Sequence, residues 1–479
     1  MMFKARALFT SLILLASSLA HAFVELEARK PLDVEGSKLS PYWAQEYVGA
    51  DLAKEELRQI PGLTPVPFAV YDGGFEKAYV NLIHDIPVDQ EQDRGRRMRA
   101  NHGTKVVNII NGPGMISVSE LVDYVQLRRT SPGAFYFGAI EDISKLPVAP
   151  QIISNSMGWP GERITELTKM LDEHGLIWVL AAGNDHPTPI ADYEVTPHVI
   201  SVGSYSPRGL QTIYSQESKE LDILAPADGY QASINGSGEA DTFGATSGAT
   251  PMVSGTIANM KALLPSLNRA EAETILKRTA IRSFNSLYSK VNHAKLLNSY
   301  KAVRVAMNLR AVCGQNVTCL SKEINNPKNY QFSALPLSSE AENICTNSKS
   351  VLNKEDMVAL RKNALLNPAH VKFNQLLSCA HRNEGYSINA DYFENLVLIY
   401  KAPRVLQNKI RQQAAEAVLK DYSESASLRD LELLDDSFKE ALTKAIKADI
   451  GIGRFNAQNY LERFAKAPRA VVVTEAARP

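Results

Sequence analysis

Between residues 60 and 305 the chain alternates short apolar runs with amphipathic stretches, and this alternation restricts the possible fold more than any other feature. Short apolar runs of this kind are typical of strands in a parallel sheet that is buried on both faces. The stretches between them repeat apolar residues at helical spacing. Together they predict an α/β fold with a mostly parallel sheet flanked by helices. The predicted strands cover 68–71, 151–154, 176–182, 199–202 and 221–225, and predicted helices cover 105–110, 164–171 and 253–264.

The N-terminus has the pattern of a secretory signal peptide. Lys4 and Arg6 precede an apolar run over 7–20, and small residues stand at the positions that a signal peptidase reads, so we expect cleavage after Ala22. The run is shorter than the roughly 20 residues that a membrane-spanning helix needs. We therefore expect a signal peptide at 1–22, no membrane span after its removal, and a secreted or periplasmic protein.

The length of 479 residues is too great for one ordinary domain. The predicted organisation is an N-terminal extension at 23–60, the α/β domain at 61–305, a cysteine-containing connector at 306–350 and an all-α C-terminal domain at 351–479. Lys plus Arg equals Asp plus Glu at 52 each, which excludes a protein built around a basic nucleic-acid-binding surface. Predicted helices of the C-terminal domain cover 356–366, 370–380, 390–400, 405–420, 428–448 and 457–465.

All four cysteines lie after residue 310, and an even number in an exported chain suggests disulfides. Local pairing, Cys313 with Cys319 and Cys345 with Cys379, is the simplest of three possible connectivities. A zinc site is the rival interpretation, but no CxxC spacing is present. We therefore expect no metal and no cofactor.

Four polar residues stand at ends of predicted strands or starts of predicted helices, where α/β proteins place their chemistry. Asp72 follows the strand at 68–71, and His102 stands just before the helix at 105–110. Asn184 follows the strand at 176–182, and Ser247 stands at or next to the N-terminus of the helix whose apolar face includes Val253 and Leu264. A backbone N–H at a helix start has no intrahelical acceptor and favours negative charge.

These residue types together supply the parts of an acyl-transfer site. A Ser hydroxyl becomes an effective nucleophile when a neighbouring His takes its proton. A carboxylate then orients the His and stabilises its charged form. The oxyanion of the tetrahedral intermediate needs preorganised donors, for which the Ser247 N–H and the Asn184 side-chain amide are suitable.

The segments around these residues resemble the motifs of subtilisin-like serine peptidases, the subtilase family. The similar segments are FAVYDGG ending at Gly74, NHGT ending at Thr104, VLAAGND ending at Asp185 and TSGATP ending at Pro251. The order Asp, His, Ser is also that of subtilases. The resemblance covers roughly residues 40–305.

This resemblance implies a subtilisin-like fold and endopeptidase activity on protein or peptide substrates. It also implies site roles, residue by residue: Asp72, His102 and Ser247 are catalytic, Asn184 binds the oxyanion, and Ser156, Met157 and Gly158 bind substrate. The partner of the helical C-terminal domain is not identified by any motif. That domain has two possible roles, inhibition of the catalytic domain or docking.

Three positions depart from the family pattern. Lys105 replaces a second His, Gly248 follows the serine where a larger residue is usual, and Trp159 replaces a Gly in the substrate-binding segment. Only about 45 residues separate Ala22 from the first predicted strand, which is short for a folded pro-region. Within them, residues 24–57 are predicted to form a loop and one short helix. These departures keep open an alternative function, a catalytically weak or inactive subtilase-like binding module of the cell envelope.

A group of arginines, Arg94, Arg96, Arg97 and Arg99, stands just before His102. Two interpretations apply to it: a solvated loop, or a basic rim that favours acidic substrates or is itself processed.

Overall fold

The computed structural model of the protein describes residues 32–34, 37–72, 84–86, 102–128, 148–157, 164–185, 190, 196–207, 209, 211–212, 214–227, 230–234, 240–282, 294–343 and 352–384. They all belong to one compact unit, Leu32–Pro479. Some predictions concern residues outside this described part: the signal peptide at 1–22, Arg94, Arg96, Arg97, Arg99, Gly158, Trp159, Cys345 and the helices after residue 384.

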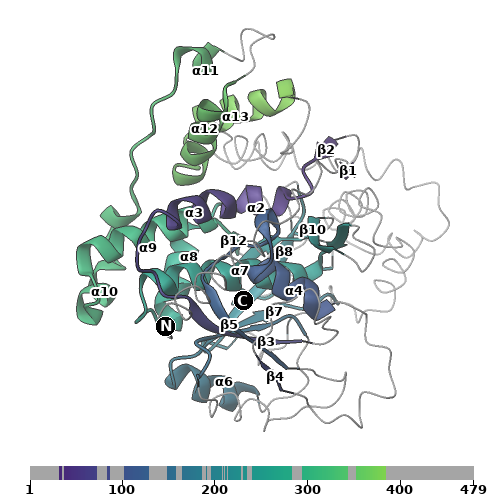
Figure 1. The fold of residues 1–479 in the computed structure, drawn as a ribbon, viewed down its shortest axis with the longest axis vertical. Helices are drawn as coiled ribbons and strands as arrows, with labels where there is room; N and C mark the ends of the chain where they lie inside the picture. Colours follow the sequence, from purple (N-terminus) through teal and green to yellow (C-terminus); the bar gives the residue numbers. More distant parts are fainter. Residues whose placement is uncertain are drawn as a thin grey trace, which may run out of the picture. The chain divides into compact units, whose positions relative to one another are not determined.

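Eight strands form one sheet, and every described strand pair in it is parallel (Figure 1). The strand order is β12-β9-β8-β7-β6-β3-β5-β4. The predicted strands and the predicted fold class are confirmed. The strands are β3 (Val66–Tyr71), β4 (His84–Ile86), β5 (Val122–Arg128), β6 (Ile152–Asn155), β7 (Ile177–Ala181), β8 (Ile200–Tyr205), β9 (Ile223–Pro226) and β12 (Lys295–Leu296).

Both faces of the sheet are buried, because its strands place apolar side chains on alternate sides. Phe68 and Val70 of β3 belong to the main hydrophobic core. Their neighbours Ala69 and Tyr71 belong to a smaller core that also contains Leu171 of α6. This explains why the strands are continuous apolar runs in the sequence.

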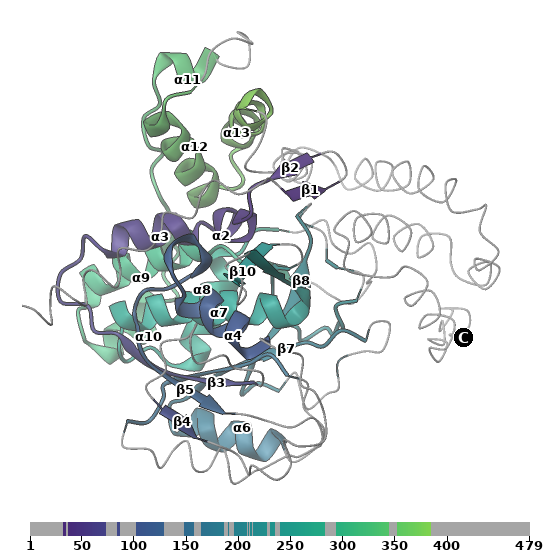
Figure 2. The same cartoon turned by 45° about the vertical axis from the view of Figure 1, so that its right-hand side comes forward.

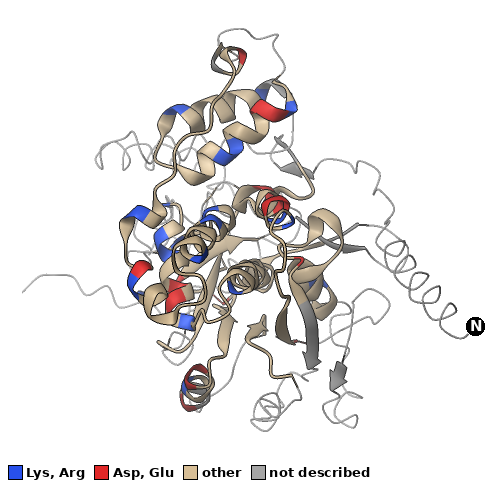
Figure 3. Ribbon diagram, turned by 60° about the vertical axis from the view of Figure 1, so that its left-hand side comes forward, with Lys and Arg blue, Asp and Glu red and all other residues tan. Residues whose placement is uncertain are grey.

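Helices cover the two faces unequally (Figure 2). On the main-core face lie α4 (His102–Asn111), α7 (Ala245–Leu263), α8 (Arg269–Thr279) and α9 (Ser299–Cys313), while α6 (Ile164–Glu173) covers the other face. Helix α7 contacts α4, α9 and the strands β6 to β9, so it is the central helix of the domain. Charged residues lie on the helices, and the central strands β3, β6, β7, β8 and β9 carry none (Figure 3).

Two antiparallel hairpins accompany the main sheet: β1 (Leu32–Val34) with β2 (Ser37–Leu39), and β10 (Tyr230–Ile234) with β11 (Ala240–Phe243). A short 3-10 helix, η3 (Gly114–Ile116), follows α4.

The N-terminal extension differs from the sequence prediction of a loop with one short helix over 24–57. It contains two helices, α2 (Trp43–Val48) and α3 (Ala50–Leu57), joined at Gly49. Trp43 and Tyr47 are buried in the main core. Gly49 has φ +70°, and a Cβ there would lie 2.6 Å from Leu365 Cδ1 and 2.7 Å from Tyr300 Cβ. The prediction was wrong because the burial that stabilises this second helix comes from segments distant in the sequence.

The same extension is fastened to the loop that follows α4. Lys54 Nζ donates to the Gly114 carbonyl at 2.6 Å and the Ser117 carbonyl at 2.7 Å. Gln45 Nε2 donates to the Ile116 carbonyl at 2.7 Å. Burial lowers the pKa of Lys54 to about 8. These bonds tie residues 45–54 to the helix that begins at His102.

Beyond α9 the described chain is helical, which confirms the helices predicted at 356–366 and 370–380 but also adds three short helices inside the predicted connector at 306–350. It contains α10 (Val317–Glu323), η5 (Pro327–Tyr330), α11 (Ser339–Asn343), α12 (Lys354–Leu366) and α13 (Val371–Glu384). The predicted disulfide Cys313–Cys319 is confirmed. Cys379 is also disulfide-bonded. The predicted boundary at residue 305 falls inside α9.

Charged side chains join the N-terminal extension to α9 and α12. Glu56 accepts hydrogen bonds from Tyr300 Oη at 2.6 Å, Arg304 Nη1 at 2.8 Å and Lys362 Nζ at 2.9 Å. Burial alone would raise the pKa of Glu56, but these three hydrogen bonds outweigh it and hold the pKa below its ordinary value. Arg361 also binds both carboxylate oxygens of Asp51, at 2.7 and 3.0 Å.

No helix in the described part of the chain is sufficiently long and apolar to cross a membrane.

Candidate functional site

The structure brings Asp72 and His102 together at the carboxyl end of the sheet. Asp72 directly follows β3 and is fully buried, and His102 is the first residue of α4. The distance between His102 Nδ1 and Asp72 Oδ1 is 2.7 Å. An ionised carboxylate can only accept hydrogen bonds, so this contact places a proton on Nδ1 and leaves Nε2 as the basic nitrogen of the ring.

The end of β11 lies against His102. The Phe243 ring meets the imidazole edge to face, with 5.0 Å between the ring centroids. Lys105, one turn after His102, places its ammonium 5.7 Å from the centre of the Phe243 ring and donates to the Thr242 carbonyl at 3.3 Å. Lys105, which departs from the pattern of the resembled family, therefore contacts β11, the strand that packs on His102. Phe243 of the same strand restricts the orientation of the imidazole.

Ser247 lies in the first turn of α7, as the sequence predicts. The first hydrogen bond of the helix runs from the Gly248 N–H to the Gly244 carbonyl at 3.0 Å. The Ser247 N–H comes before it, so it takes no part in the regular i to i−4 hydrogen bonds of the helix. Ala245 has φ +60°, a left-handed conformation that costs an L-residue about 1–2 kcal/mol. Such strain is frequent where a chain must present a functional group.

Two hydrogen bonds in opposite directions connect Ser247 with Ser156. The Ser247 hydroxyl donates to the Ser156 carbonyl at 3.1 Å, and the Ser156 hydroxyl donates to the Ser247 carbonyl at 3.0 Å. The second bond compensates for Pro251, which stands four residues after Ser247 inside α7 and has no N–H to donate to that carbonyl. Ser156 therefore supplies the donor that a regular helix would have provided.

Asn184 is held in one amide orientation by Thr246. Its side-chain oxygen accepts from the Thr246 N–H at 3.0 Å and the Thr246 hydroxyl at 2.9 Å. A backbone N–H only donates, so the atom facing it must be Oδ1, and the NH₂ group is directed elsewhere. This fixes Asn184 beside Ser247 with its donor available to a further acceptor.

Gln216 supports the turn that carries Asn184. Its backbone N–H donates to the Gly183 carbonyl at 3.1 Å, and its side-chain oxygen accepts from the Asp185 N–H at 3.4 Å. Gly183 has φ +89°, and a Cβ there would lie 2.0 Å from Gln216 Oε1. The positive φ favours glycine at this position, and a Cβ would also displace the Gln216 side chain from its hydrogen bond with Asp185.

The predicted substrate-binding segment continues from β6. The Met157 N–H donates to Asn155 Oδ1 at 2.9 Å, which fixes the turn after Ser156. Ser154 on the same strand accepts from the Ser254 hydroxyl at 3.0 Å and so attaches β6 to α7. No cluster of three or more His, Cys, Asp or Glu side chains with a metal-binding arrangement occurs among the described residues.

The structure thus joins Asp72 to His102 and, separately, Ser247 to Ser156. Asn184 binds Thr246, the neighbour of Ser247, and Met157 follows Ser156 in the turn after β6. Sequence reasoning missed Thr246, Gln216 and Phe243. Thr246 adjoins Ser247 and could have been inferred from that position. Gln216 and Phe243 carry no motif, since their roles come from contacts with the turn at Gly183 and with His102.

The order of polar residues around the sheet matches a known family. Residues 70–306 match the model of the subtilase family, described as peptidase family S8. This chain belongs to the subtilase family. The matched region begins in β3 and ends in α9, so it contains all the site residues described above.

Subtilases in several bacteria are similar to this chain. Alkaline elastase YaB of Bacillus sp. (strain YaB) is 27% identical over 292 residues, which cover 55% of this chain and 75% of the elastase. An extracellular protease of Xanthomonas campestris pv. campestris is 28% identical over 182 residues, 36% of this chain and 31% of that protease. Subtilisin E of Bacillus subtilis (strain 168) is 26% identical over 239 residues, 47% and 62% of the two chains. The matched segment thus spans less than two thirds of two of these three relatives.

Solved subtilase structures are also similar. A chain from the structure of the subtilase cytotoxin SubAB assembly has a TM-score of 0.47 and 20% identity, covering 57% of this chain and 99% of its own. A protease of Pseudoalteromonas arctica PAMC 21717 has a TM-score of 0.43 and 20% identity, covering 58% and 100%.

Proposed function

We propose that this subtilase is an exported serine endopeptidase with Asp72, His102 and Ser247 as its catalytic residues. The single observation that carries the proposal is the short contact of 2.7 Å between Asp72 and His102 Nδ1, because it leaves His102 Nε2 as the base. Membership of a family of serine peptidases supports the same conclusion.

In the proposed reaction the Ser247 hydroxyl turns from the Ser156 carbonyl to His102. Ser247 Oγ forms a bond to the carbonyl carbon of a peptide, and its proton passes to His102 Nε2. The carbon–nitrogen bond then breaks, and the same proton goes to the leaving amine. Water, deprotonated by His102, releases the acyl group from Ser247.

The oxyanion of the intermediate is proposed to accept from the Ser247 N–H and the Asn184 NH₂ group. The first donor lies at the start of α7, where the helix dipole also favours negative charge. The second is oriented by Thr246. Ser156, Met157 and Gly158 are proposed to bind the substrate, a protein or peptide, next to this position.

Export is proposed from the signal-like sequence at 1–22 and is supported by a relative named as an extracellular protease. The proposed organisation keeps the segment at 23–60 attached to the α/β domain at 61–305, followed by the connector at 306–350 and the helical domain at 351–479.

The test exposes the chain without residues 1–22 to a fluorophosphonate probe and to casein, beside the Ser247→Ala variant. We expect labelling and cleavage by the first protein and neither by the variant. A folded protein that reacts with neither reagent overturns the proposal and supports the alternative, a binding module that retains the subtilase fold.

A further inference from the structure

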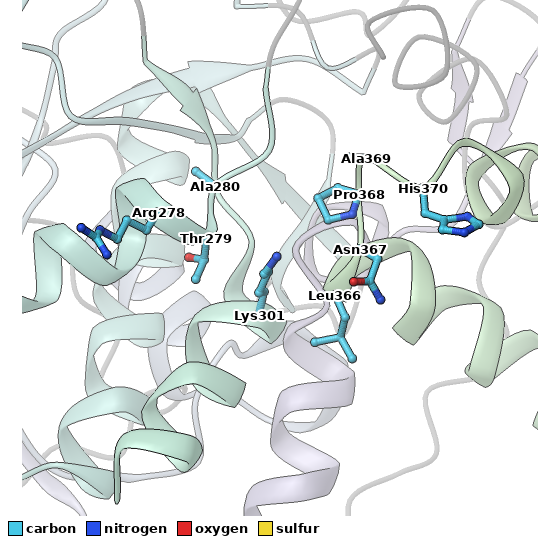
Figure 4. Close-up of a pocket in the computed structure, with 9 residues that line it drawn as sticks. All are labelled: Arg278, Thr279, Ala280, Lys301, Leu366, Asn367, Pro368, Ala369 and His370. Carbon is cyan, nitrogen blue, oxygen red and sulfur yellow. The ribbon is translucent and has the colours of Figure 1, made fainter. Parts of the chain in front are cut away.

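A cavity of about 440 Å³ lies away from the proposed catalytic residues (Figure 4). Three segments line it: the end of α8 at Arg278–Ala280, the first turn of α9 at Lys301, and the connection between α12 and α13 at Leu366–His370. Its volume falls in the range of cavities that bind small molecules. The cavity therefore lies between the region that matches the subtilase family, residues 70–306, and the helices that follow it.

The described residues that line this cavity carry only one sign of charge. Arg278 and Lys301 are cationic, and none of the lining residues that the structure describes is Asp or Glu. Arg278 directs its guanidinium to the Asn325 carbonyl at 3.0 Å and to the Tyr330 ring, so it adds positive charge at the rim. Figure 4 shows Lys301 extending between the end of α8 and the α12–α13 connection. Lys301 is thus the cationic side chain that extends into the middle of the cavity, while Arg278 lies at its rim.

Lys301 differs from the other cations on this side of the structure. Arg304, one turn further along α9, and Lys362 of α12 both bind Glu56. Among the described residues, no carboxylate lies within ion-pair distance of Lys301, and its ammonium is 6.0 Å from the centre of the Phe332 ring. Burial lowers the pKa of Lys301 below its ordinary value. An anion in the cavity would offset that desolvation.

Polar groups beside Lys301 add to the site. Asn367, which ends α12, lines the cavity and has an amide that can donate to an oxyanion. His370 lies further along the same connection, with its ring stacked on Phe373 at 4.1 Å between centroids.

We propose that this cavity is a binding site for a small oxyanion, a carboxylate or a phosphate group, with Lys301 as its ion-pair partner and Asn367 as a second donor. The ligand would contact α9 and the α12–α13 connection at the same time. Its binding therefore stabilises the attachment of the helical region to the subtilase region. This site is independent of the proposed peptidase activity.

The test uses isothermal titration of the chain lacking residues 1–22 and carrying Ser247→Ala, which removes any self-digestion. Inorganic phosphate and acetate are titrated separately at constant ionic strength. We expect at least one of them to bind and to raise the Tm, and comparison of the two distinguishes a phosphate site from a carboxylate site. The Lys301→Gln variant should bind it at least tenfold more weakly, and Lys301→Arg should retain binding.

The matched control is Lys328→Gln, which removes the same charge from an exposed position in η5 and should leave the affinity unchanged. Circular dichroism confirms that each variant is folded. The proposal is overturned if neither anion binds to the folded protein, or if Lys301→Gln binds as tightly as the parent.

Discussion

The hydrogen bonds between Ser156 and Ser247 lead to a sharp prediction for Ser156→Ala. This change removes the donor to the Ser247 carbonyl but keeps the Ser156 carbonyl that accepts from the Ser247 hydroxyl. Because Pro251 supplies no N–H, the carbonyl loses the donor that replaces the missing helical bond. A buried polar group left in this state costs about 1–3 kcal/mol.

The assay divides this loss between folding and catalysis. Urea unfolding measures the free energy of unfolding, and cleavage of a chromogenic peptide measures kcat and kcat/KM. If the whole 1–3 kcal/mol appears in the transition state, kcat/KM falls roughly fivefold to 150-fold. We expect a lower kcat with a smaller change in KM, because the carbonyl belongs to the proposed nucleophile, and we expect Ser156→Thr to restore part of the rate.

Ser254→Ala is the matched control. Ser254 is a buried serine of α7, the helix that carries Ser247, and its hydroxyl oxygen lies 3.0 Å from both Ser154 Oγ and the Thr250 carbonyl oxygen. That carbonyl is also the regular i−4 acceptor of the Ser254 N–H, so no carbonyl loses its only donor. Equal losses of kcat in Ser156→Ala and Ser254→Ala would refute the reasoning, as would an unchanged kcat in Ser156→Ala.

Further predictions concern the oxyanion donor, the Glu56 contacts and the disulfide. Asn184→Ala should lower kcat by about 10²–10³ with little change in KM, the scale for loss of one oxyanion-hole donor, and equal rates would exclude Asn184 from that role. Glu56→Gln should destabilise the fold at pH 7 by about 1–3 kcal/mol, whereas the exposed Glu55→Gln should not. Since the pKa of Glu56 is lowered by folding, its contribution is complete above the ordinary Glu pKa and is lost as the pH falls through the lower, folded value. Urea midpoints of the two variants should therefore converge in acid, and a constant difference would contradict the assignment. Replacing Cys313 and Cys319 by Ala should cost about 2 kcal/mol because the loop is only six residues long, and an unchanged Tm would contradict that estimate.

The sheet could be predicted from the sequence because each of its strands is a local apolar run buried on both faces. The pattern at 176–182, for example, is fully buried as β7. Local patterns also predicted the positions of Asp72 and His102, because Asp72 directly follows a clear strand pattern and His102 stands at the start of a clear helix pattern. The residues that support the site could not be predicted, because they are distant in the sequence from the residues they contact. Gln216 is 33 residues from Gly183, and no periodicity connects them.

The N-terminal extension shows how long-range packing changes the meaning of a segment. From the sequence alone, residues 40–57 belong to a segment that is short for a folded pro-region. As structure, they bury Trp43 and Tyr47 in the main core, and Lys54 binds the loop after the helix that begins at His102. Removal of these two aromatic side chains alone would expose surface worth several kcal/mol, a large part of the stability of an ordinary domain. A segment packed in this way is a structural part of the domain, so we expect residues 40–57 to remain in the mature protein.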